Sequence, residues 1–186
     1  MNHAPSYGIP STDPLTDWNN HNNDRLIGFP LDVPVEVVMG ALGAWRHAWN
    51  LARSDGQTVG VANQAANEAF RDAYKTAQGC MDCDGPRRWP SQGLHLDHRD
   101  DNEKAAQGRN PSDVSRAANI RWPAWRYILE VSKCDVVCGY HHDVRTEARS
   151  QGITREDAAA RIGAARRVAV LSGLRAEGVA VQTLGV

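Results

Sequence analysis

The first regular pattern of hydrophobic positions lies in residues 32–56. Apolar side chains recur there three or four positions apart, as on one face of an α-helix; they are Val35, Val38, Met39, Leu42, Trp45 and Trp49. Asp32 is suited to cap the start of this helix, and Pro34 fits its first turn. A second helical pattern of alanines and aromatic residues follows and ends at Gly79. Together the two patterns predict a helical hairpin over residues 32–78.

Further along the chain, the patterns are shorter and mix strands with helices. LHLDHR, residues 94–99, alternates between apolar and polar side chains, as expected of a half-buried strand. WPAWRYILEVSK follows the helical period, and the β-prone stretch CDVVC, residues 134–138, predicts a second strand. HHDVRTEARSQG predicts a short helix that ends at Gly152, and Thr154 opens a longer helix with an approximate capping box.

The C-terminal segment TREDAAARIGAARRVAVLSGL fits two structures. One is a single amphipathic helix with a basic face, and the other is a helix-turn-helix in which Gly163 lies near the turn. In either structure, Arg161, Arg166 and Arg167 could contact DNA phosphates.

Composition and charge are those of an ordinary globular protein. Of 186 residues, 41% are hydrophobic and 23% are charged, and no apolar run approaches the ~18–20 residues that span a bilayer. The start MNHAPSYGIPSTDP lacks the basic and apolar regions of a secretory signal. We therefore expect a cytoplasmic protein with no membrane partner. The net charge of −1, with the acidic excess in residues 1–79, is not that of a protein that binds nucleic acid over its whole surface.

The four cysteines are arranged like metal ligands. Disulfides are rare in a reducing compartment, so a metal is the leading explanation. Cys80 and Cys83 form a C-x-x-C turn, and Cys138 and His141 have the same spacing. Together they supply the four N/S ligands that a structural Zn²⁺ takes. Cys134 is an alternative to His141, but a strand would hold it too far from Cys138 to chelate easily, so we expect it to be a buried small side chain.

A second group of residues suggests different chemistry. Asp97 precedes His98 at the end of the first predicted strand, and His142 follows the last proposed zinc ligand. A carboxylate and an imidazole can hold a divalent cation that leaves positions open for phosphate oxygens, and a neutral histidine nearby can deprotonate water. His95 lies two positions before Asp97, on the same face of the strand, and we favour a structural or neutral role for it over a phosphate or metal contact.

The order of these motifs resembles the HNH endonuclease family, in the zinc-knuckle form common in phages and bacteria. The resemblance covers roughly residues 79–149 and depends on the C-x-x-C turn, the D-H strand end and KCDVVCGYHHDVRT. It implies an α+β fold: a ββα-metal (HNH) finger stapled by a zinc knuckle and flanked by α-helices. It also implies that His98 is the general base, that Asp97 and His142 bind a catalytic Mg²⁺ or Mn²⁺, and that the structural zinc has the ligands Cys80, Cys83, Cys138 and His141.

Two departures from the family pattern concern the zinc site and the catalytic loop. The family has Cys where this chain has His141, which keeps a ligand that zinc accepts and gives a Cys₃His site. The middle Asn, which orients the catalytic loop, is not evident, and Lys133 stands where many members carry it. The residues that could substitute for it are Asn102, Asn110, Asn119 and Asp113.

The resulting prediction is a metal-dependent HNH endonuclease that nicks or cuts DNA. The alternative is a catalytically degenerate, zinc-stapled DNA-binding or assembly protein; the near-neutral charge and the missing Asn favour it, whereas the retained Asp97, His98 and His142 favour the enzyme. A redox role for the C-x-x-C motif is disfavoured because no βαβ pattern surrounds it.

The resemblance implies DNA as the partner, with other phage or restriction proteins as further candidates, in the host cytoplasm if the protein is phage-encoded. We expect a mobile N-terminal arm (1–31), the helical hairpin (32–78), the HNH module (79–150) and a C-terminal helix and tail (151–186).

Overall fold

The computed structural model describes residues 33–84, 89–100, 106–107, 110–111 and 121–176. The predicted N-terminal arm lies outside these residues. The chain forms two compact units with a boundary between Cys138 and Gly139, and each is described by itself. No helix in the described part of the chain is both long and apolar enough to cross a bilayer.

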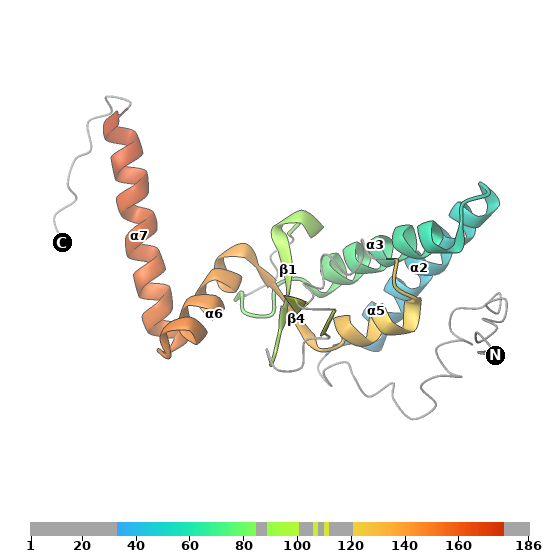
Figure 1. Cartoon of the computed structure of the whole chain (residues 1–186). Helices are drawn as coiled ribbons and strands as arrows, with labels where there is room; N and C mark the ends of the chain where they lie inside the picture. Colours follow the sequence, from blue (N-terminus) through green and yellow to red (C-terminus); the bar gives the residue numbers. More distant parts are fainter. Residues whose placement is uncertain (1–32, 85–88, 101–105, 108–109, 112–120, 177–186) are drawn as a thin grey trace. The chain divides into compact units, whose positions relative to one another are not determined.

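Two long helices, α2 (Val35–Ser54) and α3 (Val59–Gln78), pack against each other in the first unit (Figure 1). They correspond to the two helical patterns in the sequence. Thr58 caps the start of α3, where its Oγ1 accepts a hydrogen bond from the Val61 N–H. The buried side chains along α3 are Ala62, Ala66, Asn67, Phe70, Tyr74 and Lys75. The hairpin therefore has a core of alanines and aromatic rings.

A short helix, α5 (Ala124–Val131), packs on α3 through its aromatic side chains. Phe70 meets the edge of the Tyr127 ring, with 6.4 Å between the centroids. Asn67 connects three segments: its Oδ1 accepts from Trp45 Nε1 at 2.9 Å and its Nδ2 donates to the Trp122 carbonyl at 3.0 Å. This buried amide fixes the start of α5 against both long helices.

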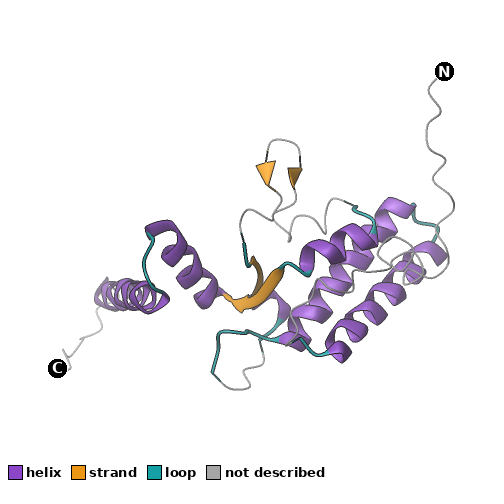
Figure 2. Cartoon of the chain, turned by 90° about the horizontal axis from the view of Figure 1, so that it is seen from below, coloured by secondary structure: helices purple, strands orange, loops and turns teal. Residues whose placement is uncertain are grey.

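The central sheet has two antiparallel strands, β1 (Leu94–His98) and β4 (Cys134–Cys138). A single 3₁₀ turn, η1 (Ser91–Gly93), leads into β1. The register pairs Leu94 with Cys138 and His98 with Cys134, so the Asp-His end of β1 lies beside the start of β4. Figure 2 shows this pair in orange, with a second, shorter pair formed by β2 (Ala106–Gln107) and β3 (Asn110–Pro111). Helices with a small antiparallel sheet agree with the predicted α+β class.

The second unit consists of α6 (Gly139–Gln151) and α7 (Arg155–Ala176). The two helices share a small apolar cluster, whose members are Val144, Ala148 and Ala158 with Tyr140, Ile153, Ala159 and Ile162. Gly152, with a φ of +62°, ends α6, as its sequence position predicts. Thr154 Oγ1 accepts from the Asp157 N–H at 3.1 Å and donates to the Asp157 carboxylate at 2.9 Å, so Thr154 caps the start of α7 and Asp157 binds its hydroxyl.

The structure corrects two expectations about this unit. α7 continues through Gly163 as one helix, so the helix-turn-helix alternative for this segment is wrong. α6 begins at Gly139 and not at His141, directly after the last residue of β4. Both histidines therefore belong to the first turn of α6.

Candidate metal centre and catalytic residues

The turn that carries Cys80 and Cys83 is fixed at both ends. Gly79 ends α3 with a φ of +70° and donates its N–H to the Lys75 carbonyl. The Met81 N–H then donates to the Val136 carbonyl of β4 at 2.9 Å, and the Cys83 N–H to the Cys80 carbonyl at 3.4 Å. These bonds place the C-x-x-C turn beside β4, the strand that ends in Cys138.

Cys80, Cys83, Cys138 and His141 form one cluster of potential metal ligands. Their ligand atoms all lie within 4.8 Å of one another, and the Sγ atoms of Cys83 and Cys138 are 3.8 Å apart. A tetrahedral zinc with Zn–S bonds of about 2.3 Å requires sulfur–sulfur distances of about 3.8 Å. The cluster could therefore hold a zinc ion, and the residues are those that the sequence spacing predicts.

Protonation of these thiols also has a bearing on metal binding. The four cysteines, all within the described residues, form no disulfide. Burial, together with hydrogen bonds between Cys83 and the thiols of Cys80 and Cys138, raises the pKa of Cys83 to about 11. A divalent cation stabilises the thiolate form, so binding of zinc would release protons.

Cys134 is separate from this cluster. It is fully buried at the start of β4, and its Sγ donates to the Glu130 carbonyl at 3.5 Å. Burial raises the pKa of its thiol far above the usual range, which keeps it protonated. The ligand group found among the described residues does not include it. Cys134 is thus a buried small side chain, as predicted.

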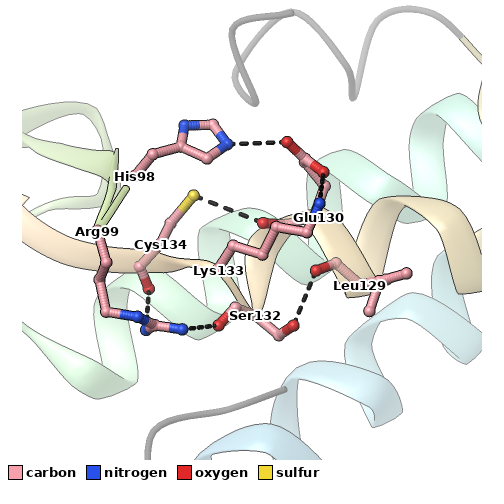
Figure 3. A network of polar contacts seen from close by, with 7 residues as sticks. All are labelled: His98, Arg99, Leu129, Glu130, Ser132, Lys133 and Cys134. Atoms are coloured by element: carbon pink, nitrogen blue, oxygen red, sulfur yellow. Dashed lines mark hydrogen bonds and ion pairs between the residues drawn. The ribbon is translucent and has the colours of Figure 1, made fainter. Parts of the chain in front are cut away.

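Asp97 and His98 lie at the end of β1, and both are buried, with exposed fractions of 5% and 4%. His98 Nε2 is 2.8 Å from Oε1 of Glu130, which is itself only 2% exposed. The other carboxylate oxygen, Oε2, accepts from Lys133 Nζ at 2.8 Å. Figure 3 shows His98, Glu130 and Lys133 in this arrangement. Glu130 is a residue of the site that the sequence reasoning missed.

Arg99 connects the end of β1 to the turn between α5 and β4. Its backbone N–H donates to the Lys133 carbonyl at 3.1 Å, and its guanidinium contacts the carbonyls of Ser132 and Cys134 (Figure 3). Lys133 thus contributes its carbonyl to Arg99 and its ammonium to Glu130. Of the predicted substitutes, Asn110 lies in β3, and the others, Asn102, Asn119 and Asp113, are outside the described residues.

The two adjacent histidines have different surroundings in the first turn of α6. The ring of His141 packs against that of Tyr140, with 5.1 Å between the centroids. His142 is 36% exposed, and its Nδ1 is 4.0 Å from an Asp143 carboxylate oxygen. The pairing of His142 with Asp97 stays a prediction, because the two residues belong to different units.

His95 faces solvent on β1, in register with Val137, whereas Asp97 on the same strand is buried. This difference is compatible with the neutral role that we favoured for it.

No protein family model, curated protein or solved structure matches this chain. A proposal of function therefore depends on the motifs and their geometry.

Proposed function

We propose that this chain is a metal-dependent HNH endonuclease that hydrolyses DNA phosphodiester bonds. The observation that carries the proposal is the order of β1, β4 and α6. Two antiparallel strands are followed, without a linker, by a helix, and the candidate residues lie at the end of the first strand and in the first turn of the helix. This is the order of a ββα-metal finger, and the Cys₃His cluster would stabilise it with zinc.

The proposed reaction uses the side chains of this chain in separate roles. Asp97 and His142 would hold Mg²⁺ or Mn²⁺, which supplies polarisation of the scissile phosphate and stabilisation of the leaving 3′-oxygen. His98 takes a proton from water as the water oxygen bonds to phosphorus, and the bond from phosphorus to the 3′-oxygen breaks. The zinc site has a structural role and takes no part in this step.

A plasmid-nicking assay in Mg²⁺ or Mn²⁺ tests this proposal. The parent should convert supercoiled plasmid to the open circle, and His98→Ala should lose about 10²–10⁴-fold in rate, the usual contribution of a general base. His95→Ala is the matched control, since it removes an exposed histidine from the same strand and should leave nicking unchanged. Equal cleavage by the parent and His98→Ala would contradict the mechanism.

The second candidate is a zinc-stapled DNA-binding or assembly protein without catalysis. The burial of both Asp97 and His98 favours it, because a general base must reach a water beside the substrate. A parent protein that retards plasmid DNA on a gel, yet nicks it with neither metal, would support this candidate.

A further inference from the structure

We propose that Glu130 is a positioning residue that holds His98 as the Nε2–H tautomer and so makes Nδ1 the nitrogen that accepts a proton from water. The catalytic meaning of this inference rests on the proposed endonuclease function. The tautomer itself follows from hydrogen bonds in the first unit and can be measured without any reaction.

The hydrogen-bonding capacities of the three side chains support one arrangement. An ammonium group can only donate, so Oε2 of Glu130 must accept from Lys133 Nζ at 2.8 Å. Glu130 is almost fully buried, and a carboxylate is rarely buried without a partner for its charge. Lys133 supplies that positive charge, and a carboxylate paired with an ammonium group accepts at both oxygens, so Oε1 is the acceptor toward His98. In a neutral His98 ring, Nε2, 2.8 Å from this oxygen, then carries the hydrogen.

The tautomer decides which nitrogen can act as a base. In a neutral imidazole one ring nitrogen carries the hydrogen and the other has a lone pair. With the hydrogen on Nε2, the lone pair is on Nδ1. The buried carboxylate would also stabilise the imidazolium that forms when Nδ1 takes a proton, as an acidic residue does when it orients a catalytic histidine.

Hydrogen bonds from neighbouring residues fix the main chain of Glu130, and this fixes the position of the carboxylate that contacts His98. Its carbonyl accepts from the Lys133 N–H at 3.2 Å and from Cys134 Sγ at 3.5 Å. Arg99, the residue after His98, donates its N–H to the Lys133 carbonyl. The end of β1 and the end of α5 are thus bonded to the same short turn, so the distance from His98 to Glu130 is constrained on both sides.

The first test is the ¹⁵N NMR spectrum of the histidine rings in the full-length, zinc-loaded protein, with His98→Ala used to assign the His98 signals. The parent should show His98 as the Nε2–H tautomer. A spectrum of the Nδ1–H tautomer in the parent would overturn the proposal, and this measurement needs no Glu130 variant to fold.

The second test is Glu130→Gln, which keeps the shape of the side chain. An amide has one acceptor oxygen, which Lys133 attracts, so its NH₂ should face His98 and shift the ring toward the Nδ1–H tautomer. We expect kcat for plasmid nicking to fall by about 10²–10⁴-fold, the range for loss of a general base, with little change in KM. Glu68→Gln, a partly buried glutamate on α3, is the control and should nick like the parent.

These results separate the two proposals. The role of Glu130 would be overturned by one result: a Glu130→Gln variant that binds zinc, keeps its thermal stability and nicks DNA at the parental rate. A parent that has the Nε2–H tautomer but nicks no DNA in Mg²⁺ or Mn²⁺ would refute the endonuclease, while the assignment of Glu130 to the His98 tautomer would stand.

Discussion

At the scale of single residues, His141 and His142 are consecutive but should serve different metals. We expect His141→Ala to reduce bound zinc from about one ion per chain to a small fraction, because it removes one ligand of the Cys₃His cluster. His142→Ala should keep the zinc and lose nicking. Metal analysis of the purified variants measures the first effect and the plasmid assay measures the second.

His141→Cys is the matched control for this pair, because a Cys₄ set is also one that structural zinc takes and should retain the ion. If His141→Ala and His142→Ala lost zinc to the same extent, the division of roles between the neighbours would be wrong.

Cys134 should behave as a buried thiol and not as a ligand. Burial raises its pKa, so at pH 8 it stays protonated, and iodoacetamide should not label it in the native protein. Cys134→Ala should cost about 1 kcal/mol of stability, measured by urea unfolding, with the zinc content unchanged. Loss of zinc in this variant would show that the ligand set is wrongly assigned.

The four candidate zinc ligands could be predicted from the sequence, whereas Glu130 could not. In each pair of ligands only two residues separate the two side chains, so the local sequence determines their spacing. Glu130 interacts with a histidine 32 residues away. In the sequence Glu130 is a single charged residue in a helix of mostly apolar side chains. Nothing in that pattern distinguishes it from a glutamate that faces solvent. The only available signal was its position three residues before Lys133.

At the scale of elements, Asn67 joins α3 to α2 and to the start of α5. Asn67→Ala leaves the Trp45 N–H and the Trp122 carbonyl without this partner in a buried place, and should cost about 2–3 kcal/mol. Asn63→Ala is the matched control: Asn63 accepts from Trp49 at 3.2 Å where both are partly exposed, so it should cost less than about 1 kcal/mol. Equal losses in urea unfolding would contradict this difference.

The spacing of apolar residues predicted most of the helices and strands. The strand register and the exact start of α6 depend on contacts between distant parts of the chain. The patterns of α2 and α3 repeat over five turns and identify them clearly. The register of β1 with β4 joins segments far apart in the chain, and no local pattern encodes it. The start of α6 at Gly139 was also missed, because glycine is a poor helix former and the strand pattern of CDVVC obscured the transition.

At the scale of the whole molecule, the Cys₃His cluster joins Cys83 to Cys138 across 55 residues. A bound ion that has no site in the unfolded chain adds about 4 kcal/mol of stability when its concentration is 1,000 times Kd. Removal of zinc with EDTA should therefore lower the melting temperature by about 10 °C or more, as followed by circular dichroism. Added zinc should restore the melting temperature, and Mg²⁺ alone should not. A melting curve that EDTA leaves unchanged would contradict the assignment of a zinc site.

The separation between the two halves of the Cys₃His cluster also matters during synthesis. At about 5–20 residues per second, a ribosome adds Cys138 roughly 3–10 s after Cys83. By that time every residue of the α2–α3 hairpin has been synthesised, whereas Cys80 and Cys83 have no second ligand pair until β4 and the first turn of α6 are made. A chain interrupted in this interval would lack Cys138 and His141, half of the candidate metal ligands, so we expect zinc retention to distinguish finished molecules from truncated ones.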